Sequence, residues 1–322
     1  GPNWLENANR QISMGNDVPD SARRTLLAAA IGLPLISTDF ARAGTAVMPD
    51  AFSAAALMAD VDVYAAGGNK ASGGPGDEQV AAWLTKRMQA LGFIVEQQPF
   101  TVPWFSTERA DLTVDGSLTP VTAQPLVQPT PADGLRAAIR LAEQGIDLNG
   151  AIALINLPYR RWSTLLDPLA RQPIVDAIAR GAKAAVVITS GPSHQALLLN
   201  TPADRPLFDC PVALLAPDLA APVIAAARRG SPATLTVTGK GGARPAHNLI
   251  ARHDRSDGPW IIVSTPRSGW TDCVGERGPG IAIWLALAAW AVAARRRHKL
   301  LFVCTSGHEY ENLGAGHLVE AF

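Results

Sequence analysis

Residues 260–322 decide the fold and read WIIVSTPRSGWTDCVGERGPGIAIWLALAAWAVAARRRHKLLFVCTSGHEYENLGAGHLVEAF. Two apolar runs of strand length, Trp260–Ser264 and Leu300–Thr305, enclose an apolar helical stretch over Ile281–Ala294. A last helix is expected to begin after the second strand and the loop that follows it. Strands that alternate with helices in this way are typical of an α/β sheet with parallel strands.

A polar, glycine-containing loop is expected after each of these strands, over Thr265–Gly280 and Ser306–Glu311. Loops at the carboxyl ends of parallel strands form the ligand crevice of α/β sheets. We therefore expect any functional site to lie where these two loops meet. The titratable and hydrogen-bonding side chains available there are Arg267, Ser268, Cys273, Glu276, Arg277, His308, Glu309 and Glu311.

The composition excludes some classes of partner. The 322 residues contain 28 Lys and Arg against 28 Asp and Glu, so no overall field favours nucleic acid, and no nucleic-acid partner is expected. The three cysteines, Cys210, Cys273 and Cys304, permit at most one intrachain bridge. A disulfide between Cys273 and Cys304 stays open at this stage.

The N-terminal residues have the pattern of an export signal. Gly1–Pro2 is typical of a pair left by tag cleavage, and Arg23–Arg24 precede a short apolar run over Leu26–Ile36. Small residues at Ala41 and Ala43 follow, as at a signal-peptide cleavage site. We expect a periplasmic or secreted protein, the alternative being an ordinary leader helix or tail. No membrane span is expected, because the apolar runs are too short.

The middle of the chain predicts an inserted domain. Asp77 is expected to cap a helix over Glu78–Leu91, and a strand over Phe93–Val102 follows. A turn over Gly239–Pro245 then leads back to a strand over His247–Arg252. The expected division is a leader over 1–47, one α/β domain built from 48–114 and 244–322, and a smaller inserted α/β domain over 115–243.

The order of these patterns resembles the di-zinc exopeptidases, which include leucine-type aminopeptidases, glutamate carboxypeptidases and glutaminyl cyclases. The likeness is carried by LGFIVE, HNLIA, WIIVST, GPGIAIWLALAAWA and LLFVCTSGHEYENLGAGH. The insert resembles a protease-associated domain through GAIALINLP, RGAKAAVVIT and CPVALLAPD. The resemblance implies a mixed, mostly parallel sheet with helices on both faces, plus the smaller α/β insert, and a hydrolase activity.

The zinc-ligand motifs of that family are largely substituted. The family's His-x-Asp corresponds to Thr265-Pro266-Arg267, and its bridging aspartate falls on Gly275. Its Glu-Glu pair, a general base followed by a ligand, corresponds to His308-Glu309. An arginine beside a dication is repulsive and cannot lose its charge, so no metal cofactor is expected. A single zinc ion on Cys273, His308 and Glu309 remains an alternative.

The family's last two ligands lie beyond the third motif, whereas this sequence stops about one helix after it. The peptidase-like domain is therefore expected to be incomplete at its C-terminal side. Because an open strand edge favours aggregation, we expect a partner chain, self-association or a further C-terminal segment to cover it.

Three functions follow from these residues. The first is a metal-independent, hydrolase-like enzyme for a small anionic or amide- or peptide-type substrate. The second is an inactive homologue that binds a protein partner. The structural alternative for Arg267 and Glu276 is an internal ion pair that fills the vacated metal position. The third is a zinc exopeptidase with atypical ligands. In the first hypothesis the catalytic residues are His308, Glu309, Cys273 and Glu276, and the substrate-binding residues are Arg267, Ser268, Arg277 and Glu311.

Overall fold

The computed structural model describes residues 50–126, 128–204 and 206–321. All of these residues belong to one compact unit, Pro49–Phe322. The expected leader and export signal over 1–47 lie outside the described residues.

The first helices precede a long strand. A short 3-10 turn, η2 (Asp50–Phe52), leads into α3 (Ala54–Ala66), whose N-cap Ser53 accepts a hydrogen bond from the Ala56 amide. Helix α4 spans Pro75–Ala90. The prediction that Asp77 caps this helix is wrong in position: Gly74 is the N-cap, and proline at the first helical position starts the helix. Asp77 lies inside the first turn, buried.

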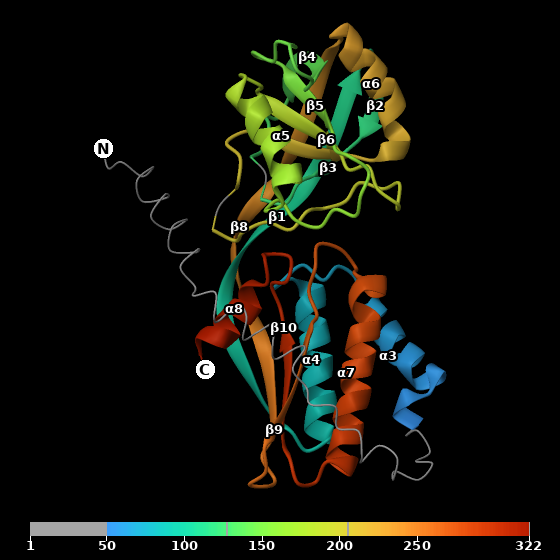
Figure 1. Ribbon diagram of the computed structural model, residues 1–322, viewed down its shortest axis with the longest axis vertical. Helices are drawn as coiled ribbons and strands as arrows, with labels where there is room; N and C mark the ends of the chain where they lie inside the picture. Colours follow the sequence, from blue (N-terminus) through green and yellow to red (C-terminus); the bar gives the residue numbers. More distant parts are fainter. Residues whose placement is uncertain (1–49, 127, 205, 322) are drawn as a thin grey trace, which may run out of the picture. The chain divides into compact units, whose positions relative to one another are not determined.

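Two long strands connect the two parts of this unit (Figure 1). β1 (Ile94–Val114) pairs antiparallel with β8 (Pro232–His253) from one end to the other, with a register shift between Thr107 and Arg109. The turn predicted over Gly239–Pro245 is wrong, because β8 stays extended there. Glycines allow close cross-strand approach: a Cβ at Gly239 would lie 2.3 Å from the Ser106 carbonyl oxygen.

The peptidase-like part places helices on both faces of its sheet. β10 (Lys299–Thr305) pairs antiparallel with β8 and parallel with β9 (Trp260–Pro266). Leu249 of β8 faces a core that α4 and α7 share, whereas the next-door Asn248 donates to the Gly314 carbonyl of α8 (Leu313–Glu320). Successive strand residues point to opposite faces, so α8 and the pair α4/α7 cover different faces.

Helix α7 (Val274–Ala294) begins inside the stretch that the sequence predicts to be loop. Its glycines and Pro279 had favoured a loop, but tertiary packing overrides this low helix propensity. At Gly278 the helix approaches α3 so closely that a Cβ would lie 3.3 Å from a Val61 methyl group. Glu276 and Arg277 are therefore helical residues of the first turn.

The insert is a separate α/β layer. Its strands β4 (Leu135–Leu141), β5 (Ile152–Asn156), β6 (Ala184–Ile188) and β7 (Val212–Leu215) run parallel in this order. The short strands β2 (Ser117–Pro120) and β3 (Thr122–Ala123) pair with β1 and β7, and β4 also pairs antiparallel with β8. Two buried clusters lie on this layer, with helices α5 (Pro168–Ala179) and α6 (Ala220–Arg229) and the 3-10 turn η3 (Pro217–Leu219). The mixed α/β fold with a smaller α/β insert is as expected.

Strand β9 is an edge within the described residues, since it pairs with β10 alone. Trp260 and Ile262 on this strand are 44% and 64% exposed. That a partner or further segment covers this edge stays a prediction. Helix α7 is, by length and composition, the one described helix that could cross a membrane, but half of its apolar window is buried inside the protein, as in a core helix.

Candidate functional site

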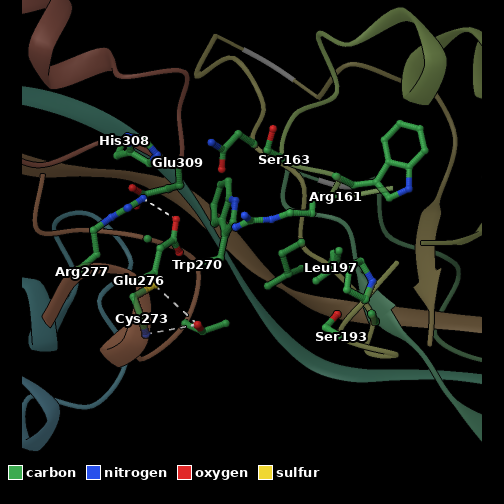
Figure 2. A pocket seen from close by; sticks show the side chains of 17 residues that line it. Arg161, Ser163, Ser193, Leu197, Trp270, Cys273, Glu276, Arg277, His308 and Glu309 are labelled. Atoms are coloured by element: carbon green, nitrogen blue, oxygen red, sulfur yellow. Dashed lines mark hydrogen bonds and ion pairs between the residues drawn. The ribbon is translucent and has the colours of Figure 1, made fainter. Parts of the chain in front are cut away.

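A cavity of about 930 Å³ lies where the insert faces the loops after β9 and β10 (Figure 2). The peptidase-like part lines it with residues 269–271, 273, 276, 277, 308 and 309. The insert lines it with residues 161–163, 192, 193, 196–198 and 200. The cavity is of the size that small-molecule and peptide sites have.

The structure brings together all four predicted catalytic residues but only one of the four predicted substrate-binding residues. Cys273, Glu276, Arg277, His308 and Glu309 all line this cavity. The other three predicted residues, Arg267, Ser268 and Glu311, do not line it.

Arg267 was predicted to bind substrate, and the structure corrects this. Its side chain is fully buried, and its Nε lies 2.9 Å from the Asp77 Oδ1. Its terminal nitrogens donate to the carbonyl oxygens of Cys304 (3.1 Å) and His247 (2.7 Å). The internal ion pair that was weighed for Arg267 exists, but its acidic partner is Asp77 and not Glu276. The sequence predicted Asp77 as a helix cap and not as a partner of Arg267, because the two residues lie far apart in the chain.

Ser268 and Glu309 form a buried hydrogen-bonded pair. The Ser268 hydroxyl donates to Glu309 Oε2 at 2.6 Å and accepts from the Gly307 amide at 2.7 Å. Glu309 Oε1 accepts from the Ser72 amide at 2.7 Å. Burial raises the pKa of Glu309 to about 7, although the bond from Ser268 opposes this rise. Ser268 is fully buried, so its hydroxyl is a positioning group rather than a substrate contact.

These two pairs belong to one buried network. The Ser306 hydroxyl donates to Asp77 Oδ2 at 2.8 Å and lies 2.5 Å from the Ser72 hydroxyl. Serine side chains thereby link the Arg267–Asp77 pair to the segment that holds Glu309. The network fills the place where the resemblance to the exopeptidases puts the zinc ligands.

The donor set does not fit a zinc centre. A catalytic zinc ion needs about three ligands from His, Cys, Asp or Glu, and residues 50–126, 128–204 and 206–321 contain no group of three or more such side chains that could hold a metal. The carboxylate of Asp77 is paired with a guanidinium, and that of Glu309 is held by Ser268 and Ser72. The alternative set of Cys273, His308 and Glu309 is thus not assembled as a metal site.

Arg277 and Glu276 pair with each other at the start of α7. The Arg277 terminal nitrogen lies 2.8 Å from a Glu276 oxygen, and its Nε donates to the Ser268 carbonyl at 3.1 Å. The Arg277 side chain is nearly buried, whereas that of Glu276 is 61% exposed. Glu276 can therefore meet a ligand directly, and Arg277 holds it in place.

Cys273 does not have the environment of an activated nucleophile. It precedes α7 in a left-handed conformation (φ 51°). Burial raises the pKa of its thiol, so the thiolate is scarce at neutral pH. The Thr271 hydroxyl lies 3.6 Å from its sulfur. The three cysteines are free, so no disulfide joins Cys273 to Cys304.

His308 is a half-buried residue of the cavity wall. Burial, together with the positive charge of Arg277, lowers its pKa. Its imidazole is therefore neutral at pH 7 and able to accept a proton. Within the described part of the chain, no hydrogen bond joins this ring to Cys273 or Ser268.

Glu311 connects the loop after β10 to the insert. Its carboxylate accepts a hydrogen bond from the Thr164 hydroxyl. A second connection runs from the Thr201 amide to the Glu309 carbonyl oxygen at 3.2 Å. Glu311 was predicted to bind substrate, but here it positions the insert above the cavity.

Three solved structures resemble the fold of this chain. A precursor of peptidase M28 from Shewanella amazonensis SB2B has a TM-score of 0.68 at 19% identity, covering 84% of this chain and 68% of its own. BSAP, a zinc aminopeptidase from Bacillus subtilis, has a TM-score of 0.63 at 20% identity, covering 83% and 64%. An aminopeptidase from Aneurinibacillus sp. strain AM-1 has a TM-score of 0.60 at 18% identity, covering 83% and 65%.

The chain has a zinc-exopeptidase-like fold. At such identities the likeness concerns the fold alone, and the chain spans about two thirds of the length of these structures. No model of a known protein family matches the sequence, and no curated protein matches it.

The sequence analysis missed the half of the cavity wall that comes from the insert. Arg161, Trp162, Ser163 and Ser193 follow insert strands at positions with no recognisable motif. Trp270 was also missed, although it lies between the predicted residues Ser268 and Cys273. A tryptophan in an otherwise polar loop is a signal that could have identified it.

Proposed function

We propose that this protein binds a peptide-type ligand in the cavity between the insert and the loops after β9 and β10. One observation carries the proposal. The buried positions that correspond to metal ligands are satisfied by protein partners, yet a cavity of about 930 Å³ stays open beside them. A cavity of this volume accommodates a few amino-acid residues.

The wall of the cavity supports a ligand with both polar and apolar parts. Leu197, Leu198 and Trp270 provide apolar surface, and Glu276 and His308 provide an acid and a neutral base. A peptide presents backbone donors and acceptors together with apolar side chains, and it can meet both kinds of group.

Calorimetric titration with tripeptides of the series Ala-Ala-X tests the proposal, with saturable binding as the expected result. Leu197→Arg places a long charged side chain in the cavity and is expected to abolish binding. Leu118→Arg is the matched control, since Leu118 lies on β2 and is 63% exposed. Absence of binding across the whole series would overturn the proposal.

Hydrolysis of the bound peptide is a second candidate, favoured by the position of His308. Its neutral imidazole can take a proton from a water molecule that attacks the peptide carbonyl carbon. The same proton can then pass to the leaving amine as the C–N bond breaks. The substrate is then an amide- or peptide-type compound, and Glu276 is the exposed acid that can orient it.

Mass spectrometry of incubated Ala-Ala-X peptides detects this hydrolysis directly. His308→Gln is expected to abolish cleavage while leaving binding in place. His194→Gln is the control, because His194 is an exposed loop residue that faces Asp218. Cleavage that survives in His308→Gln would remove His308 from the reaction.

The protein is further proposed to act outside the cytoplasm, a proposal supported by Arg23–Arg24 and the apolar run after them. N-terminal sequencing of protein from the native host tests this. A mature chain that still begins before Arg23 would contradict it.

A further inference from the structure

Arg161 is a cation of the cavity wall without a partner among the described residues. The residue is exposed, and no ion pair or hydrogen bond is formed by its guanidinium within the described ranges. The neighbouring Arg160 differs: its guanidinium lies 3.1 Å from Asp167 and covers the ring of Trp162. The other arginine of the wall, Arg277, is paired with Glu276.

The surroundings of Arg161 combine this charge with apolar surface. Figure 2 shows its side chain extending from the insert toward the side of the cavity where Trp270 lies. Leu197 and Leu198 line the same cavity from the insert. A guanidinium forms paired hydrogen bonds with a carboxylate, and aliphatic and indole surfaces bury an apolar side chain.

The wall of the cavity on the peptidase-like side adds to the positive potential inside the cavity. Helix α7 begins there with no side-chain hydrogen bond at its N-cap, and a helix N-terminus attracts negative charge. Glu276 lies in the same turn and opposes this effect, but its charge is balanced by Arg277 at 2.8 Å. Among the described residues of the wall, Arg161 is thus the cation that no acidic side chain faces.

We infer that Arg161 binds the free C-terminal carboxylate of the peptide ligand. This inference rests on the proposed function and adds the orientation of the ligand. At the C-terminus of a peptide the carboxylate and the last side chain leave the same carbon atom. Arg161 can therefore bind the carboxylate of the C-terminal residue while the apolar wall beside it contacts the side chain of the same residue. The ligand then enters with its C-terminal residue at the insert, and the rest of the peptide extends toward His308 and Glu276.

The test compares Ala-Ala-Leu with its C-terminal amide by calorimetric titration. The wild-type protein is expected to bind the amide tenfold or more weakly, since the amide cannot form the charge-assisted pair. Arg161→Gln is expected to bind the free acid as weakly as the wild type binds the amide, with no further loss for the amide itself.

Arg160→Gln is the matched control. It removes the same charge from the neighbouring residue, whose guanidinium faces Asp167 and not the cavity. It is expected to keep the preference for the free acid. Equal binding of acid and amide by the wild type would overturn the inference and leave the proposed function standing. Failure of both peptides to bind overturns the inference, and failure of the whole Ala-Ala-X series overturns the proposed function as well.

Discussion

The guanidinium of Arg267 and the carboxylate of Asp77 meet 2.9 Å apart, and neither side chain is exposed to solvent. The pair joins the loop after β9 to the first turn of α4. The carbonyl oxygens of His247 and Cys304 each accept one hydrogen bond from the terminal nitrogens of Arg267. A charge so deeply buried is tolerated because a carboxylate and two carbonyl oxygens lie against it.

Removing one member of this pair is expected to destabilise the fold. Arg267→Met leaves the Asp77 carboxylate buried without its counter-ion, which costs about 3–5 kcal/mol. Urea unfolding measures the loss. The control is Arg252→Met, which breaks a pair with Glu96 whose side chains are 47% and 53% exposed. That change is expected to cost about 1 kcal/mol or less. Equal losses in the two variants would contradict the structural role of Arg267.

Glu309 is expected to make stability depend on pH in an unusual direction. Its pKa rises from 4.5 to about 7 on folding, so the folded state holds a proton that the unfolded state releases. The stabilisation is therefore complete below pH 4.5 and is lost as the pH rises to about 7. Its size is on the order of 3 kcal/mol.

The measurement is the free energy of unfolding between pH 4.5 and pH 8. Glu309→Gln resembles the protonated carboxyl. Its free energy of unfolding, relative to that of the wild type, is expected to increase by on the order of 3 kcal/mol between pH 4.5 and pH 8. Glu276→Gln changes a side chain that is 61% exposed and is the control. A constant difference between wild type and Glu309→Gln at every pH would refute the raised pKa.

The sequence predicted where the site lies better than what each residue does. Strand–loop–helix order alone located the loops after β9 and β10, because the strands are continuous apolar runs. The roles of Arg267 and Ser268 could not be predicted, since their partners Asp77, Ser72 and Glu309 come from distant segments. Burial decides these roles, and a sequence without the fold does not reveal which polar residue is buried.

The two largest errors in secondary structure have one cause. The sequence predicted loops at the start of α7 and over Gly239–Pro245 because glycine and proline are poor formers of helices and strands. At Gly278 and Gly239 the missing side chain instead allows another backbone or side chain to approach. Local propensity cannot distinguish a glycine that ends an element from one that allows two elements to pack.

We expect the purified protein not to contain a stoichiometric amount of zinc. Asp77 is committed to Arg267 and Glu309 to Ser268 and Ser72, so the chelator EDTA should not change the midpoint of thermal unfolding. Metal analysis of the purified protein gives an independent readout. One zinc ion per chain, together with a lower midpoint in EDTA, would contradict the assignment of the buried network.

Two glycines of α8 are expected to respond in opposite ways to alanine. A Cβ at Gly314 would lie 2.1 Å from the Ser306 carbonyl oxygen and 2.5 Å from Asn248 Oδ1, whereas a Cβ at Gly316 would meet no atom within 4 Å. Gly314→Ala must push α8 away from Ser306 and is expected to cost roughly 1–3 kcal/mol. Gly316→Ala is expected to stabilise the protein by about 0.5–1 kcal/mol through helix propensity alone. Urea unfolding of the two variants compares them directly.

Gly314→Ala is also expected to weaken peptide binding at the cavity, because Ser306 bonds to Asp77. A Gly314→Ala variant that loses stability but keeps full affinity for the peptide would show that α8 does not influence the site.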